Sequence, residues 1–271
     1  MNRRVLNALG LVVAAIMSFP VFWMASTAFK PTGDILSYTP KVLPWPPTLE
    51  HFQTAVTEPF FLDYLRNSLV VVLVAMVLSL VTAALAALAV ARLRWRGRKG
   101  YLLLIMLAQT APFEALLIPT FLILRDAGLL NQLPALILTY FMITLPFTVW
   151  TLRGFVAAIP VELEEAAMTD GCTRLGAYRR VVLPLLGPGL VATGVFAFIT
   201  AWNEFMFALV IMQEPDKLTL PVWLATFRTA FGTDWGATMA ASTLFTLPVL
   251  VFFLIVQRRL VSGLSAGAVK G

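Results

Sequence analysis

A polar stretch between long apolar segments reads Glu165-Ala166-Ala167-Met168-Thr169-Asp170-Gly171, and after nine further residues the chain continues Val181-Val182-Leu183-Pro184. Pro160 fits the start of a short helix here, and three glutamates crowd its first turn, where the helix dipole favours negative charge. Helical spacing places four residues on one shallow face suited to a cleft on another protein: Leu163, Ala166, Ala167 and Asp170.

The residues after this helix predict a sharp turn into a second one. Gly171 stands where a helix-ending glycine allows a left-handed backbone. Thr173 is placed to cap the next helix, on which Leu175, Tyr178 and Val182 share a face. Pro184 then precedes the next apolar segment. We therefore predict a helix–glycine–helix elbow that acts as a rigid lever between two apolar segments.

Composition sets the class of protein. Of the 271 residues, 59% are hydrophobic and 13% charged, and the mean hydropathy is +0.86. A soluble domain of this length needs more polar surface, whereas lipid solvates the outside of a polytopic membrane protein. The net charge of +6 lies in short basic runs beside apolar segments, a placement typical of membrane topology rather than of nucleic-acid binding. The sequence predicts an all-α polytopic membrane protein.

Six segments approach or exceed the roughly 20 apolar residues that cross a bilayer. The first follows Arg3 and Arg4 as a signal peptide would, but it exceeds the usual core of about 7–15 residues, so we expect an uncleaved helix. The predicted spans are 5–29, 69–91, 101–124, 133–152, 185–211 and 237–256.

Basic residues predict the orientation of these spans. With a cytoplasmic N-terminus, 14 of the 20 basic residues lie inside, which agrees with the preference of Lys and Arg for that face. Both termini and the loop 153–184 would then be cytoplasmic. The outer segments would hold the other six, which are Lys30, Lys41, Arg66, Arg125, Lys217 and Arg228.

Two sizeable outer loops, Pro31 to Arg66 and Met212 to Gly236, contain several prolines and aromatic residues. They are either interfacial caps with aromatic belts or a surface that receives a substrate-delivering protein. His51 in the first loop is expected to be a solvated surface residue.

The spacing of Glu-Ala-Ala, Gly and Leu-Pro resembles the cytoplasmic docking loop of the membrane-spanning subunits of bacterial ABC importers. Val181 stands where that loop usually has Ile, a difference of little consequence. Nearly the whole chain is similar to the smaller permease of maltose- and trehalose-type systems. The resemblance includes Trp202-Asn203-Glu204-Phe205, Leu218-Thr219-Leu220-Pro221 and the tail Gly263-Leu264-Ser265-Ala266-Gly267-Ala268-Val269-Lys270-Gly271.

This resemblance implies a single permease domain over residues 1–271 with the type I ABC importer fold, in a bacterial or archaeal cell membrane. It implies three kinds of partner: a second, larger permease, a pair of ATPase subunits and an extracytoplasmic sugar-binding protein. The implied ATPase contacts in the loop are Glu165, Ala166, Ala167, Asp170, Gly171, Leu183 and Pro184.

The resemblance also implies that the tail reaches between the ATPase subunits, whereas its composition alone indicates a flexible, solvated terminus. The tail residues concerned are Gly263, Leu264, Gly267, Lys270 and Gly271. The sequence contains no Gly-x-x-x-x-Gly-Lys-Ser/Thr, so we expect ATP and Mg²⁺ to bind the partner, and no cofactor or metal to bind this chain.

Polar residues inside the spans are candidates for the transport pathway. Glu114 lies in the third span between Pro112 and Pro119, which would break the helix. A central carboxylate costs about 2.5–3.5 kcal/mol, so it should face protein or water, either lining a pathway or making an interhelical hydrogen bond. Asn203 and Glu204, in the outer half of the fifth span, are further candidates. The family's sugar contacts lie mainly in the larger permease, which argues against direct substrate binding here.

Two other classes of function compete with this interpretation. An ion-coupled secondary transporter would share the hydrophobicity and could use Glu114 or Glu204, but it usually has internal repeats and needs no docking loop. An intramembrane enzyme would need clustered His, Asp or Cys in the spans, and this chain has one His and one Cys. The sequence therefore favours a sugar permease, without naming the sugar.

Overall fold

The computed structural model describes residues 3–229 and 232–268, and their side chains as far as Gln257. Regular structure in this part of the chain is helical apart from two short strands, β1 (Arg228–Thr229) and β2 (Gly232–Thr233). The strands pair antiparallel, with Arg228 opposite Thr233. The predicted all-α fold class is confirmed.

Among the described residues, four helices are long and apolar enough to cross a membrane, or up to six if two bent helix pairs each count as one span. The helices occupy all six segments that hydropathy singled out, because runs of apolar residues must satisfy their backbone groups internally in lipid. The four long ones are α1 (Arg3–Ala28), α4 (Phe61–Arg92), α7 (Leu133–Ala158) and α14 (Trp235–Ala268).

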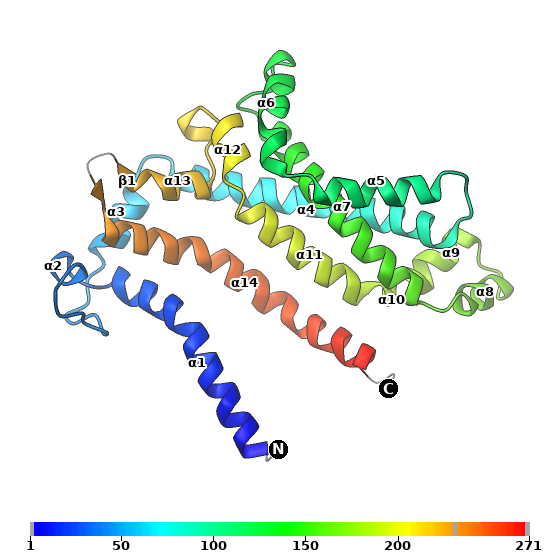
Figure 1. Ribbon diagram of the computed structural model, residues 1–271, viewed down its shortest axis with the longest axis horizontal. Helices are drawn as coiled ribbons and strands as arrows, with labels where there is room; N and C mark the ends of the chain where they lie inside the picture. The colour runs from blue at the N-terminus through cyan, green and yellow to red at the C-terminus, as the bar shows by residue number, and fades with distance from the viewer. Residues whose placement is uncertain (1–2, 230–231, 269–271) are drawn as a thin grey trace.

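The third predicted segment is not one straight helix. It consists of α5 (Arg98–Thr110), the 3-10 turn η1 (Phe113–Leu116) and α6 (Leu117–Asp126), with a bend of 95° between its two halves. Ala111 has an extended backbone because the following Pro112 disfavours the helical conformation there. In Figure 1, α6 therefore projects from the body while α5 runs alongside it.

The fifth predicted segment, 185–211, also needs correction. The chain passes through α9 (Arg174–Ala177), the π-helical turn η2 (Tyr178–Val182) and α10 (Leu183–Leu185), and bends by 67° into α11 (Gly187–Trp202). The long helix ends at Trp202, and Met206–Ile211 form a separate helix, α12. Between the two helices, the carboxylate of Glu204 accepts hydrogen bonds from backbone amides at the start of α12.

The polar segments gather at two opposite ends of the molecule (Figure 1). At one end lie α8 (Glu162–Thr169), α9 and α10. At the other lie the two loop regions predicted to be external, with β1 and the short helices α2 (Thr32–Ile35), α3 (Glu50–Thr57) and α13 (Leu220–Thr226). The short turn η3 (Pro215–Lys217) precedes α13.

The core is formed mainly by α4, α7, α11 and α14, and the contact between α4 and α7 is the most extensive. Phe198 stacks on Trp202 and on Phe252, with ring centroids 5.5 Å and 4.1 Å apart. Towards the end that carries α8, small and aliphatic residues such as Ala83, Leu152 and Leu186 form a second buried cluster. These contacts fix α4, α7 and the start of α11 relative to one another, close to the end of the molecule that carries α8.

Helix α1 contacts α14 but leaves most of its own surface uncovered. Its buried residues are Ser26, Thr27 and Ala28, at one end, and no part of its most apolar window is buried. In Figure 1 it diverges from the body towards its N-terminus. A helix that is apolar on all sides needs lipid or another protein around it.

His51 is not the solvated residue that the sequence suggested. Its side chain is 4% exposed, and Nε2 lies 2.9 Å from the carbonyl oxygen of Lys30. The imidazole fills the space beside Gly236, where an added Cβ would come within 2.2 Å of the ring. His51 thus joins the end of α1 to the start of α14, a contact between residues far apart in the sequence.

The last helix extends beyond the apolar span. α14 continues to Ala268, so Gly263, Leu264 and Gly267 are helical, which differs from the flexible terminus that composition alone indicates. Lys270 and Gly271 lie outside the described residues.

Candidate functional site

The predicted elbow is present at the α8 end of the molecule. Helix α8 begins after Val161, and Glu162, Glu164 and Glu165 occupy its first turn. Their negative charge opposes the partial positive charge of the helix N-terminus, which favours a helix that is otherwise short.

Gly171 ends this helix in the way the sequence predicts. Its φ of +89° lies in the left-handed region, where a side chain would be strained. The amide of Cys172 donates to the carbonyl of Ala167 at 3.0 Å, and the amide of Gly171 donates to Met168 at 3.1 Å. This pair of bonds is a Schellman motif, which satisfies the last carbonyls of α8 and fixes the direction of the exit.

The second half of the elbow begins at Thr173. Its hydroxyl accepts a hydrogen bond from the amide of Gly176 at 3.1 Å, which confirms the predicted cap. The helix then widens into the π-helical turn η2 before Leu183 and Pro184 lead towards the 67° bend. Leu175 and Tyr178 line one apolar pocket together with residues of α4, while Val182 is fully buried and Leu175 is 66% exposed.

One face of the elbow is open. Leu163 is 44% exposed, Ala166 and Asp170 are exposed, and Ala167 is half-buried. Beside this face lies an open pocket of about 530 Å³, lined by Gly171, Cys172, Thr173, Gly176, Arg179 and Arg180. Among these residues, Arg180 donates to the sulfur of Cys172 at 3.4 Å. Leu163 and Ala166 thus form a small exposed apolar surface, and Arg179 and Arg180 place positive charge beside it, an arrangement suited to contact with a protein partner.

Glu164 and Glu165 point in different directions, although the sequence places both in the first turn of α8. Glu165 is exposed, whereas Glu164 is 5% exposed and pairs with Arg92 at the end of α4. No local pattern distinguishes the two glutamates, since the pairing joins residues 72 positions apart.

The three pathway candidates have different surroundings and are not brought together by a common contact. Glu114 is exposed on η1, at the bend of the third segment, and within the described residues it makes no interhelical hydrogen bond. Asn203 is exposed and donates back to the carbonyl of Ile199. Glu204 accepts from the amides of Phe207 and Ala208 at 2.9 and 3.1 Å, and so caps α12.

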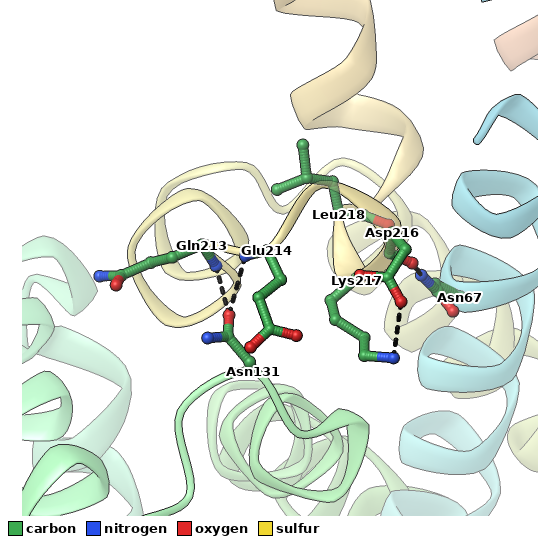
Figure 2. A network of polar contacts seen from close by, with 7 residues as sticks. All are labelled: Asn67, Asn131, Gln213, Glu214, Asp216, Lys217 and Leu218. Atoms are coloured by element: carbon green, nitrogen blue, oxygen red, sulfur yellow. Dashed lines mark hydrogen bonds and ion pairs between the residues drawn. The ribbon is translucent and has the colours of Figure 1, made fainter. Parts of the chain in front are cut away.

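At the opposite end, two asparagines hold the segment between α12 and α13 (Figure 2). The side-chain oxygen of Asn131 accepts from the amides of Gln213 and Glu214 at 2.6 and 3.0 Å. The side-chain amide of Asn67, on α4, donates to the carbonyls of Asp216 and Leu218, both at 3.0 Å. We call residues 212–220 the outer strap, and these bonds fasten it to α4 and to the loop before α7.

The outer strap carries an ion pair at its exposed surface. Lys217 lies 2.8 Å from Asp216, and this hydrogen bond lowers the pKa of Asp216 and raises the pKa of Lys217. Both residues line an open polar pocket of about 400 Å³ together with Asp63, Arg66, Asn67, Asn131, Gln132, Leu133 and Pro134. In the described part of the chain, no group of three or more His, Cys, Asp or Glu is placed to hold a metal ion.

Comparison with known proteins identifies the family of this chain. Residues 79–266, more than half of the chain, match the model of the binding-protein-dependent transport system inner membrane component. The chain belongs to this family. It is a membrane-embedded permease of an ABC importer and not itself an enzyme.

Individual relatives of this permease agree over almost their whole length. The chain is 54% identical to the diacetylchitobiose uptake system permease protein DasC of Streptomyces coelicolor, covering 98% of this chain and 96% of the relative. It is 37% identical to the trehalose transport system permease protein SugB of Mycobacterium tuberculosis, covering 97% and 96%. A crystal structure of a bacterial ABC transporter that imports alginate matches with a TM-score of 0.79 at 22% identity, covering 94% of this chain and 95% of that one, which supports the fold.

Proposed function

We propose that this permease forms, with a second and larger permease, the membrane pathway of a sugar importer whose energy comes from a separate pair of ATPase subunits. An extracytoplasmic binding protein would deliver the sugar at the end formed by α2, α3 and α13. The ATPase pair would bind the elbow at the opposite end, in the cytoplasm, and both termini would lie on that side.

The observation that carries the proposal is the geometry of the elbow. Helix α8 presents Leu163 and Ala166 to solvent, and Gly171 and Thr173 fix the turn into the segment that leads to α11. A rigid, exposed helix joined through a defined turn to membrane helices can transmit the movement of a bound partner. The chain has no phosphate-binding loop of its own, so the partner must supply the ATP hydrolysis.

For the transported molecule we propose a neutral di- or oligosaccharide. The relative with 54% identity is named for diacetylchitobiose and another for trehalose, which supports a soluble sugar of this size. Because the sugar contacts are expected in the partner permease, this chain is proposed to set the shape of the pathway rather than to select the sugar.

The decisive experiment is to express the tagged chain with the proteins encoded beside it and to identify what remains bound after purification in detergent. We expect a second permease and an ATPase with a phosphate-binding loop. Replacement of Glu165 and Gly171 should release the ATPase without releasing the second permease.

Transport by the purified complex then separates the two classes of transporter. In proteoliposomes, uptake of diacetylchitobiose or trehalose should require ATP and the loaded binding protein, and it should survive proton and sodium uncouplers. A chain that purifies alone and transports without ATP would instead be an ion-coupled carrier, and the elbow would have no coupling role.

A further inference from the structure

The elbow is attached to the membrane helices at a place other than its two covalent ends. Arg92 is the last residue of α4, and its Nε donates to Oε1 of Glu164 on α8 at 2.5 Å. Both side chains are almost fully buried, with 8% and 7% of their surface exposed. A long arginine and a glutamate rarely give up water in this way unless each satisfies the other.

The same guanidinium makes a second bond. Its Nη2 donates to the carbonyl oxygen of Ile159 at 2.7 Å, and Ile159 is the residue that caps the C-terminus of α7. The last carbonyls of a helix have no partner within it and carry partial negative charge, so a cation there is favourable. One arginine therefore joins the end of α4, the end of α7 and the side of α8.

The charged residues nearest in sequence to Arg92 and Glu164 do not share this environment. Arg94 and Arg96 lie just after Arg92 and are exposed, and Glu162 and Glu165 lie on either side of Glu164 and are exposed. Burial therefore distinguishes Arg92 and Glu164 from the charged residues next to them in the sequence.

Stability alone is a weak explanation for such a pair. The cost of removing two charges from water offsets most of their attraction, and apolar residues of similar volume often stabilise a protein equally well. What an apolar contact does not provide is a fixed orientation, whereas the planar guanidinium binds two acceptors in a defined geometry.

We propose that Arg92 and Glu164 form a clamp that makes α4 move together with the elbow during transport. This inference rests on the proposed function, because it assumes that an ATPase displaces α8. Covalent connections carry such a displacement into α7 and, through α9 and α10, into α11. The clamp adds α4, which packs along α7 more extensively than any other pair of helices in the described structure.

The consequence is that three membrane helices respond as one body. Without the clamp, α8 could pivot on the short segment between Ile159 and Glu162 and on the turn at Gly171, and part of the displacement would be lost there. Arg92 and Glu164 are thus positioning residues, which touch neither the sugar nor ATP.

The clamp is tested in the assembled transporter with Arg92→Gln, Glu164→Gln and the double variant. The measured quantity is the amount of sugar transported per ATP hydrolysed in the presence of loaded binding protein. We expect each single variant to keep the bound ATPase and its hydrolysis but to lower this ratio about fivefold or more, the usual size of coupling between sites. The double variant should be no worse than either single one, because either substitution already removes the charge pair and leaves the other charge buried without a counter-ion.

Arg96→Gln is the matched control, since Arg96 is a nearby exposed arginine. It should leave the ratio within about twofold of the original value, because exposed charges contribute little. If a Gln variant fails to insert, Arg92→Lys decides the question: lysine keeps the charge but not the planar two-acceptor geometry, so we expect insertion with a reduced ratio.

The outcomes separate the clamp from the proposed function. An unchanged ratio in Arg92→Gln and Glu164→Gln, or in inserted Arg92→Lys where they fail, would overturn the clamp alone, provided that the unmodified complex transports with ATP. Strictly additive losses in the double variant would also overturn it. A chain that binds no ATPase would instead refute the function on which the clamp rests.

Discussion

Gly171 is a residue whose role depends on its backbone alone. Its φ of +89° excludes proline, and its amide donates to Met168 at 3.1 Å. We predict that Gly171→Pro inserts normally but loses ATP-driven uptake, because the elbow loses both its turn and a hydrogen bond. The measurement is uptake in proteoliposomes together with the amount of bound ATPase.

The control for this change is Gly171→Asn. Asparagine tolerates the left-handed conformation better than other residues with side chains, and an added Cβ here meets no atom within 4 Å. It should retain most of the uptake. Normal uptake by the proline variant would show that the elbow does not act as a lever.

Gly189 is required for a different reason, because the neighbouring helix leaves no room for a side chain at this position. An added Cβ would lie 2.6 Å from Cγ and 3.0 Å from Cβ of Phe155, where α11 crosses α7. These atoms are close to the backbone and cannot move aside easily, so Gly189→Ala should destabilise the protein by about 1–3 kcal/mol. The check is the thermal unfolding midpoint in detergent.

Gly154 lies inside α7, and an added Cβ there meets nothing within 4 Å. Gly154→Ala should therefore be neutral or stabilise the protein by up to about 1 kcal/mol, since it lowers the entropy of the unfolded chain. Equal unfolding midpoints for the two variants would contradict the close approach of α7 and α11.

At the scale of elements, the outer strap illustrates how a loop is given a fixed position. Asn131 has a φ of +62°, and its side-chain oxygen accepts hydrogen bonds from two backbone amides of the outer strap. Both its backbone conformation and its side chain therefore serve this contact. We predict that Asn131→Gly, which keeps this backbone but removes the acceptor, speeds hydrogen exchange of the Gln213 and Glu214 amides about tenfold. Each lost bond is worth about 1 kcal/mol.

Asn131→Asp provides the comparison, because a carboxylate oxygen can accept the same two amides. Exchange in that variant should stay close to the original rate. If the glycine variant exchanged equally slowly, the strap would be held by Asn67 and its other contacts without Asn131.

The bent elements show what proline and capping do to a membrane segment. The break at Ala111 and Pro112 turns α6 by 95° from α5, and Glu204 caps α12 just after α11 has ended. Hydropathy detects the apolar character of both segments, but it contains no information on the direction of the chain after a break.

At the scale of the molecule, α1 and α6 extend from the body, and the apolar part of α1 is unburied (Figure 1). Such surface is expected of a chain that completes its packing in lipid and beside the proposed second permease. The elbow and the outer strap lie at opposite ends, so the membrane helices would connect the proposed ATPase site with the proposed site for a binding protein.

The single cysteine allows the orientation of the whole molecule to be measured. Cys172 lies in the elbow and is partly exposed. We predict that a membrane-impermeant maleimide labels it in inside-out vesicles but not in intact cells, since the elbow should be cytoplasmic. Moving the cysteine to the external loop, as Cys172→Ser with Tyr38→Cys, should reverse the pattern because Tyr38 is fully exposed. Labelling of Cys172 in intact cells would show that the orientation of the chain is opposite to the one proposed.

The sequence by itself determined the features that depend on neighbouring residues. The elbow could be predicted because a glycine at a helix end, a threonine cap and glutamates in the first turn act within a few residues. The membrane class followed from hydropathy, since lipid demands long apolar runs in any arrangement.

Only the tertiary structure decided which distant residues meet. It turned Glu164 inwards to Arg92 while Glu165 stayed exposed, buried His51 against Gly236, and held the outer strap with Asn131 and Asn67. The physical reason is that these contacts depend on the relative placement of whole helices, which side-chain packing sets jointly along the chain. Local rules describe each helix separately and cannot specify how two of them approach each other.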